Sequence, residues 1–220
     1  MLSVRKIEAL PTKGILMEIE LKYAIDSEEI AAKIWEDEEL KKIEEAGTRE
    51  IVLMNATYFD TADLDLSKND MAYRVRKEGE RLIASLKWGG GSEGALHKRE
   101  EINIPVMDNK PNPVIFETCD IGEDLLAILG GKELRPVLEM NIERKRFRVD
   151  TESTILEISV DGGEIVTING TEPVCEVEVE LFSGSVDVMM KIGQAMAEKY
   201  GLVSEKRSKF YRGLMLLGQR

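Results

Sequence analysis

The chain has 220 residues, a formal net charge of −12 and 43% hydrophobic residues, a composition typical of a globular protein that can bury a core. So acidic a chain is a poor candidate for binding nucleic acid or a membrane, although a local cationic pocket is compatible with it. Its two cysteines and single histidine exclude a multi-histidine metal site and indicate neither a disulfide framework nor a zinc site, so any metal would need oxygen ligands.

The first residues, MLSVRKIEALPTKG, contain no long apolar run. We predict that residues 1–14 are an N-terminal extension rather than a secretory signal. No run of about 18 apolar residues occurs, so no membrane-spanning helix is predicted. With the low cysteine content, these features predict a cytoplasmic protein.

Alternating apolar and polar residues predict strands along most of the remaining chain. The predicted strands cover residues 17–25, 57–61, 72–78, 81–88, 97–106, 137–150, 154–163, 163–168 and 175–182. Turn signals such as GGGSEG, DGGE and NGTEP separate several of them. About eight or nine antiparallel strands suit a barrel or a sandwich.

Three helices are predicted between these strands. The first covers about residues 27–46, with Asp26 as a candidate N-cap. The second covers about 122–129 and the third about 185–200, each with apolar residues at helical spacing. A further helical turn or two is expected from Ser208. No linker divides the chain, so residues 15–220 are predicted to form one domain.

The charges of the predicted strands gather on one face of each strand, and several faces carry one sign. Residues 18 and 20 and residues 176, 178 and 180 are all glutamates, whereas positions 74, 76, 144 and 146 are all arginines. Side chains two apart on a strand lie roughly 7 Å apart, so like charges there repel one another. A single such face is adequately explained as a solvated outer surface. The whole set is better explained by a barrel with its charges inward, where a cation lies between the carboxylates and a polyanion between the arginines.

The stretch MEIELKYAI fits this arrangement. Glu18 and Glu20 offer hard oxygen ligands to a divalent ion, and Lys22 could contact an anion that the ion also binds. The arginine and lysine faces would bind phosphate oxygens through charge-assisted hydrogen bonds.

Nine segments in chain order resemble the motifs of the CYTH superfamily, also called triphosphate tunnel metalloenzymes. They are EIELK, YFDT, YRVR, SLKWGG, KREEINI, IERKRFRV, LEISVDGG, CEVEVELFSG and EKRSKFYRG. Each motif alone is weak, but nine in the right order from residue 17 onward form a specific signal. The resemblance implies an α+β, mainly β fold, in which an eight-stranded antiparallel closed barrel with peripheral helices forms a tunnel whose lumen is the active site.

The resemblance also implies metal-dependent hydrolysis of a triphosphate chain with Mg²⁺ or Mn²⁺. EVEVELFSG and the Ser-Lys-x-x-Arg-Gly ending resemble bacterial inorganic triphosphatases, which split tripolyphosphate into pyrophosphate and phosphate. The expected partner is therefore a triphosphate-containing small molecule or inorganic polyphosphate, and a homodimer is compatible with this interpretation. Three alternatives stay open: a class IV-like adenylate cyclase, a thiamine triphosphatase, and a polyphosphate-binding module without turnover.

The resemblance assigns roles residue by residue. Glu18 is expected to position the attacking water, with Lys22 beside it, and Glu20, Glu178 and Glu180 are the expected metal ligands. The expected phosphate-binding residues are Lys22, Arg74, Arg76, Lys87, Arg99, Arg144, Arg146 and Lys209. Four further acids are expected to face the lumen: Glu101, Glu157, Asp161 and Glu176. Many relatives carry a second acid where this chain has Asn103, which weakens the case for a second metal site.

Overall fold

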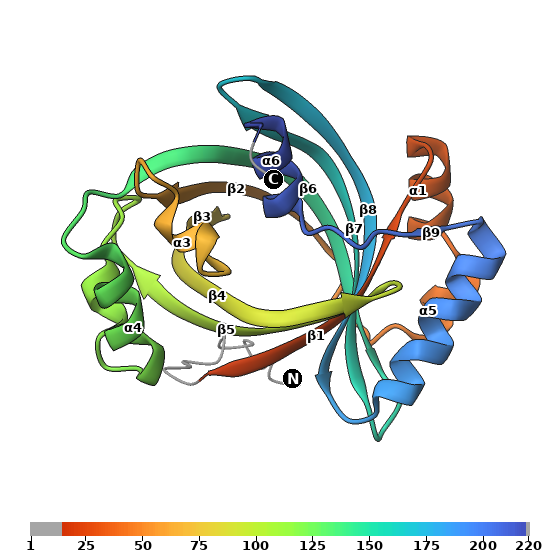
Figure 1. Cartoon of the computed structure of the whole chain (residues 1–220). Coiled ribbons are helices and arrows are strands. Elements are labelled where there is room, and N and C mark those ends of the chain that lie inside the picture. Colours follow the sequence, from red (N-terminus) through yellow and green to blue (C-terminus); the bar gives the residue numbers. More distant parts are fainter. Residues whose placement is uncertain (1–14, 219–220) are drawn as a thin grey trace.

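The computed structural model describes residues 15–218, in which eight antiparallel strands close into a barrel (Figure 1). The strands are β1 (Leu16–Ala24), β2 (Glu50–Asp60), β3 (Met71–Glu78), β4 (Arg81–Glu93), β5 (Leu96–Val106), β6 (Arg135–Asp150), β7 (Ile155–Thr167) and β8 (Gly170–Ser183). Their order is β5-β4-β3-β2-β6-β7-β8-β1, and pairing of β1 with β5 closes the barrel. A short strand, β9 (Val203–Ser204), pairs with β1. The predicted mainly β barrel with peripheral helices is confirmed.

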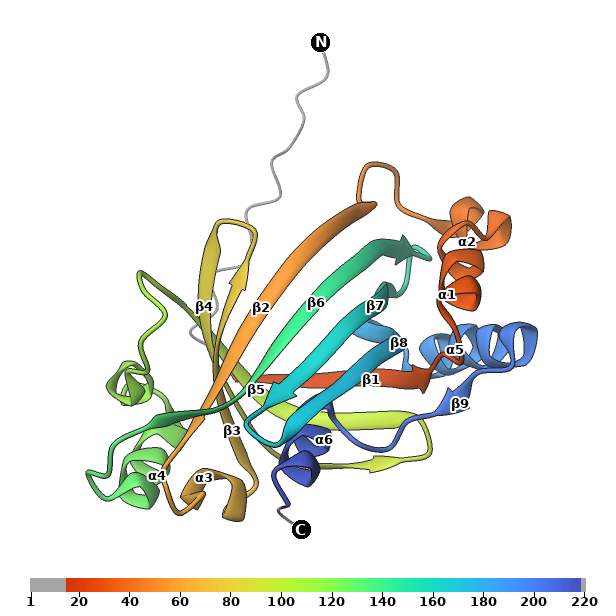
Figure 2. The same ribbon diagram turned by 90° about the horizontal axis from the view of Figure 1, so that it is seen from above.

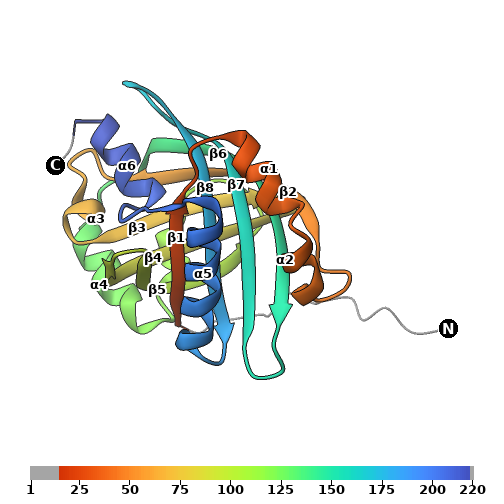
Figure 3. The ribbon, with the colours of Figure 1, turned by 90° about the vertical axis from the view of Figure 1, so that its right-hand side faces the viewer.

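The helices lie around the barrel. They are α1 (Glu28–Trp35), α2 (Glu38–Ile43), α3 (Asp65–Lys68), α4 (Asp120–Leu129), α5 (Val186–Tyr200) and α6 (Lys209–Leu216), with a 3₁₀ turn, η1, at Pro113–Phe116. Helices α1 and α5 lie on one side of the barrel, and α3 and α4 lie on the opposite side (Figure 1). Helix α5 runs along the outer face of β1 and β8 (Figure 3). No helix within residues 15–218 is long and apolar enough to cross a membrane.

The helices bury the outward-facing apolar side chains of the strands. Leu21 of β1 and Val179 of β8 belong to one buried cluster with Met189 of α5. On the opposite side, Leu86 of β4 packs in a second cluster with Leu125 of α4. Because successive side chains of a strand point to opposite faces, covering the apolar face on the outside directs the charged face into the lumen.

Three details of the predicted elements were wrong. The helix expected over residues 27–46 is interrupted, because Asp37 caps a new helix by accepting hydrogen bonds from the backbone N–H groups of Glu39 and Leu40. Ser27, rather than Asp26, caps α1.

The two strands expected to meet at residue 163 form one continuous strand, β7. A Cβ atom at Gly163 would lie 2.0 Å from the Asn141 carbonyl oxygen of β6, so glycine allows this close approach.

Asp37 also ties α2 to α5. Its carboxylate accepts hydrogen bonds from Lys199 Nζ at 2.6 Å and from the Tyr200 hydroxyl. Burial acts to raise the pKa of Asp37, but these donors outweigh burial and lower that pKa from 3.8 to about 2.

Replacing Asp37 with alanine is expected to lower the free energy of unfolding by about 2 kcal/mol at pH 7, because it removes a helix cap and an inter-helix hydrogen-bond acceptor. Since the pKa is lower in the folded state, the ionic part of this contribution is present above the unfolded value of 3.8 and is lost as the pH falls towards 2. Urea unfolding should show that the free energy of unfolding of Asp37→Ala differs less from that of wild type at pH 3 than at pH 7. The exposed Asp26→Ala variant is the control. If the free energy of unfolding differed equally at both pH values, the ionic contribution assigned to Asp37 would be contradicted.

Candidate active site

The barrel encloses a cavity of about 510 Å³. Every site residue predicted from the sequence lines this cavity, with the exception of Glu176. Glu176 lies behind the lining, where it is buried and contacts Lys209 and Arg212 of α6. Helix α6 lies beside β8 at one end of the barrel (Figure 2), which brings residues from the end of the chain to the same cavity as β1.

A row of glutamates crosses three neighbouring strands. Glu180 of β8 is the cross-strand partner of both Glu20 of β1 and Glu157 of β7. Burial, with added repulsion from Glu18 and Glu20, raises the pKa of Glu180 well above its usual range. No lysine or arginine nitrogen of residues 15–218 lies within ion-pair distance of Glu180. Like charges opposite one another destabilise a sheet, so this row favours a cation.

Two lysines lie beside the glutamate row. Lys22 Nζ is 3.0 Å from a Glu20 oxygen and 3.2 Å from a Glu178 oxygen. Burial acts to lower the pKa of Lys22, but attraction to these two carboxylates outweighs burial and raises that pKa. Lys87 Nζ donates to both oxygens of Glu18 at 2.6 Å, which fixes the orientation of that carboxylate.

Glu178 differs from Glu180 because basic groups surround it. It accepts hydrogen bonds from Arg144 and from Lys209 Nζ, the latter at 2.8 Å, and it also pairs with Lys22. Burial acts to raise the pKa of Glu178, but Lys209, Lys22 and Arg144 together lower it well below its usual range. Arg144 and Lys209 share Asp161 as a second partner, at 2.7 Å and 2.9 Å.

Arg74 and Arg76 of β3 have unsatisfied donors. Arg74 contacts the Tyr58 hydroxyl at 3.3 Å and Glu101 at 3.4 Å, and Arg76 pairs with Glu78 at 3.2 Å. The Nε atoms of both arginines are buried without a hydrogen-bond partner among the described residues. Burial and repulsion from Arg74 lower the pKa of Arg76 to about 10. Two adjacent, incompletely paired guanidinium groups in a cavity form a site for an anion.

The remaining predicted cations are already paired. Arg99 donates to Asp70 at 2.6 Å, and Arg146 donates to Glu78 at 2.8 Å and also pairs with Glu50. The cavity therefore combines an acidic row with a basic wall. This arrangement is suited to binding a polyanion together with a cation.

Residues 16–214 match the model of the CYTH domain family. The chain belongs to the CYTH family.

Known relatives of this CYTH chain include an inorganic triphosphatase from Haemophilus influenzae, which is 29% identical over 202 residues. The match covers 92% of this chain and 55% of that relative, so the chain spans about half of the relative's length. Among solved structures, a putative adenylyl cyclase from Hippeastrum with a dominant triphosphatase activity has a TM-score of 0.63 at 18% identity, with 92% of this chain and 97% of that chain covered. A putative adenylate cyclase from Bacillus halodurans has a TM-score of 0.54 at 19% identity, and the match covers 89% of this chain and 95% of that chain.

The lumen of this CYTH chain fits the divalent ion that the family implies in ligand type and charge. Carboxylate oxygens are the ligands that Mg²⁺ and Mn²⁺ prefer, and Glu180 faces other acids without a basic partner among residues 15–218. No three described Asp, Glu, His or Cys side chains are placed so that they could hold an ion together. Binding would therefore require side-chain rotation, and Glu20 and Glu180 are freer to rotate than Glu178 with its three basic partners.

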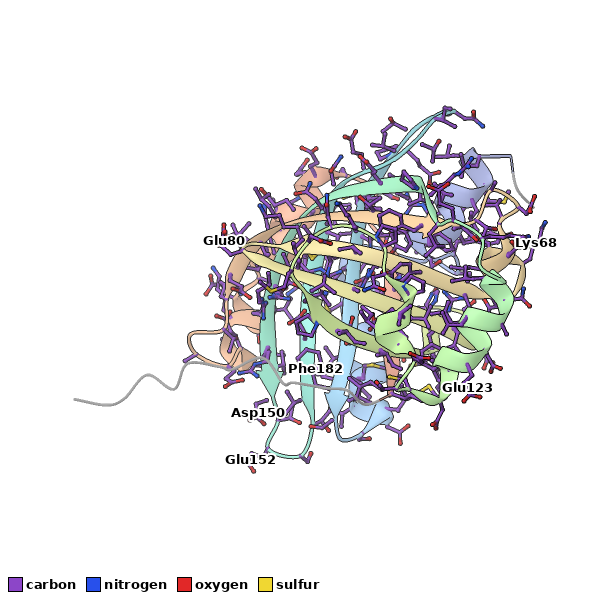
Figure 4. The ribbon with its side chains drawn as sticks, turned by 90° about the vertical axis from the view of Figure 1, so that its left-hand side faces the viewer. Lys68, Glu80, Glu123, Asp150, Glu152 and Phe182 are labelled. Atoms are coloured by element: carbon purple, nitrogen blue, oxygen red, sulfur yellow. The ribbon has the colours of Figure 1, made fainter. Side chains whose placement is uncertain are left out.

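Sequence reasoning missed several lining residues of this CYTH chain. His97, which was not among the predicted site residues, lines the cavity, is only 8% exposed and contacts the Glu205 carbonyl oxygen at 2.8 Å. Its position two residues before Arg99 was a signal for the same inward face. Phe182 was not among the predicted site residues either. It lies at the end of β8, above the β6–β7 turn that carries Glu152 (Figure 4), and it lines the cavity.

Proposed function

We propose that this chain is a metal-dependent triphosphatase that hydrolyses inorganic tripolyphosphate to pyrophosphate and phosphate inside the barrel. The observation that carries this proposal is a single cavity in which the uncompensated carboxylate of Glu180 lies with the unsatisfied guanidinium donors of Arg74 and Arg76. The name of the Haemophilus influenzae relative supports it.

The basic wall would hold the phosphate chain. Arg74 and Arg76 would satisfy their free Nε donors on phosphate oxygens. Arg144 and Lys209 now donate to Asp161 and Glu178, and phosphate oxygens would take over some of these donors. Lys22, Lys87, Arg99 and Arg146 would supply further positive charge along the chain. Most of the rate enhancement in such a site comes from positioning and electrostatic stabilisation.

Glu18 would orient the attacking water and accept its proton. Its carboxylate faces the lumen and is fixed by the two hydrogen bonds from Lys87. A carboxylate that is fixed within hydrogen-bond reach of a water molecule can act as a general base. Lys22 lies between Glu20 and Glu178, where it would contact the phosphate group that is attacked.

Glu20 and Glu180 would hold the metal ion, with Glu178 as the third expected ligand. When bound, Mg²⁺ or Mn²⁺ neutralises negative charge on the phosphate oxygens and thereby favours attack on phosphorus. Glu101, Glu157 and Asp161 would balance the lysine and arginine charges of the lumen, and Glu176 would orient Lys209.

A substrate panel tests the proposal against its alternatives. The chain is incubated with tripolyphosphate, ATP, thiamine triphosphate or long-chain polyphosphate, with either metal, while phosphate and cyclic AMP are measured separately. We expect phosphate from tripolyphosphate in the presence of metal. Cyclic AMP as the main product from ATP would instead identify a cyclase, turnover restricted to thiamine triphosphate would identify a thiamine triphosphatase, and tight binding without turnover would identify a binding module.

A further inference from the structure

His97 is the only histidine of the chain, and the proposed chemistry does not use it. Its imidazole is buried beside the lumen, where Nε2 lies 2.8 Å from the Glu205 carbonyl oxygen. Because a carbonyl oxygen can only accept a hydrogen bond, Nε2 carries a proton and donates the bond. We call residues 205–208, which join β9 to α6, the strap. His97 therefore holds the strap through its backbone.

Ser92 supplies a second side-chain hydrogen bond to the strap, which runs past the end of the β4–β5 hairpin (Figure 2). The Ser92 hydroxyl donates to the Lys206 carbonyl oxygen at 3.2 Å. Ser92 and His97 are cross-strand partners, so their side chains lie next to one another and reach consecutive carbonyl groups of the strap. The Glu205 N–H also donates to the Lys22 carbonyl oxygen at 3.1 Å.

A β-bulge in β4 brings Ser92 onto the inward face. Between the positions where Lys87 and Ser92 pair with β5, β4 has one residue more than β5. Because side chains alternate along a strand, an uninterrupted β4 with an inward Lys87 would direct Ser92 outward. Gly90 allows the bulge, since a Cβ atom there would lie 1.9 Å from the Lys98 carbonyl oxygen. The glycine run of this hairpin thus places a donor beneath the strap.

The strap brings an unpaired cation to the end of the lumen beside α6. Lys206 lines the cavity, and no carboxylate oxygen of residues 15–218 lies within ion-pair distance of its Nζ atom. The next residue, Arg207, is by contrast paired with Glu205 at 2.9 Å. Lys209 at the start of α6 is paired as well. Lys206 is therefore the cation of this segment that can contact an anion without first leaving a carboxylate.

We propose that His97 is a positioning residue that, together with Ser92, holds the strap so that Lys206 contacts the end of the triphosphate nearest α6. The proposal rests on the proposed function only for the place of the phosphate chain in the lumen. Fixing the backbone of one residue costs roughly 1–2 kcal/mol of conformational free energy. Because the hydrogen bonds from His97 and Ser92 fix the strap before the anion binds, binding does not bear this cost.

Calorimetric titration with diimidotriphosphate, an imido-bridged analogue of tripolyphosphate, tests this in the presence of Mg²⁺ without turnover. Lys206→Met is expected to raise the Kd about fivefold, because a charge-assisted contact at a solvent-exposed residue is lost. His97→Ala should raise the Kd by a similar factor. The double variant should bind no more weakly than either single variant, because both changes remove the same contact.

Two further variants separate the hydrogen bond of His97 from its bulk and from general charge. His97→Gln keeps an N–H donor in place of Nε2 and should bind within about twofold of wild type. Lys98→Met removes an exposed positive charge at the neighbouring position of β5, outside the cavity lining, and should leave the Kd unchanged. If circular dichroism shows that His97→Ala is unfolded, Ser92→Ala tests the second hydrogen bond to the strap, and its Kd should rise about twofold.

An unchanged Kd in Lys206→Met, or in a folded His97→Ala or Ser92→Ala variant, would overturn the proposal. A double variant whose Kd rises by the product of the two single factors would also overturn it, because His97 would then act independently of Lys206. The same holds if His97→Gln binds as weakly as His97→Ala, or if wild type does not bind the analogue. Absence of phosphate release from every substrate would refute the proposed hydrolysis alone, because the Kd is measured without catalysis.

Discussion

Glu20→Gln is expected to lower kcat/KM for tripolyphosphate by about 100- to 1,000-fold while leaving the protein folded. The substitution keeps the shape of the side chain but removes a negative charge that would bind the metal. The variant loses the ion pair between Glu20 and Lys22, but Lys22 keeps Glu178 as a partner, and the repulsion between Glu20 and the opposite Glu180 is removed. The variant should therefore unfold at the same or a higher temperature than wild type. Thermal unfolding and phosphate release are the two measurements.

The matched control is Glu164→Gln, which changes an exposed glutamate outside the cavity lining. It should leave both activity and melting temperature unchanged. A Glu20→Gln variant with full activity would show that the glutamate row does not take part in catalysis. A variant that loses activity and stability together would indicate a structural role.

The second large effect is expected at Arg76. Arg76→Met should lower kcat/KM for tripolyphosphate by about 10- to 100-fold, because a charge-assisted contact to phosphate is lost. The same variant should raise the free energy of unfolding by about 1 kcal/mol. Its guanidinium is buried beside Arg74 and its pKa is lowered to about 10, so at neutral pH the folded state bears the full cost of keeping it charged. Glu78 retains Arg146 and Arg81 as partners.

Urea unfolding and steady-state kinetics test this combination. Lys77→Met changes the adjacent, exposed residue of β3 and serves as the control for removal of a positive charge. Destabilisation by Arg76→Met would contradict the view that the charge of this arginine serves phosphate binding at a cost in stability. An unchanged kcat/KM would show that Arg76 does not bind the phosphate chain.

Much of the barrel could be predicted because strand periodicity is a local property. Glu18, Glu20 and Lys22 occupy alternate positions of one strand, and this alone places them on one face. We predicted that this face points inward because like charges two apart on a strand repel one another, unless a cation or a polyanion lies between them. The predicted site residues other than Glu176 consequently lie around one cavity, whereas their catalytic and binding roles stay proposals.

What the sequence could not provide depends on contacts between distant segments. The division of α1 from α2 depends on Asp37, which also binds α5, and capping competes with helix continuation in a way that periodicity does not reveal. Glu178 and Glu180 look equivalent in the sequence. Only the folded barrel shows that Arg144 and Lys209 surround the first, whereas glutamates flank the second.

The acidic and basic faces of the lumen are proposed to act together on a triphosphate chain. The most direct measurement is the time course of phosphate release from tripolyphosphate by the purified chain, with Mg²⁺, with Mn²⁺, and with a chelator in place of metal. We expect phosphate release with either metal, and this release should stop when the chelator is added. Stoichiometric capture of tripolyphosphate, with no phosphate liberated under either metal, would contradict it.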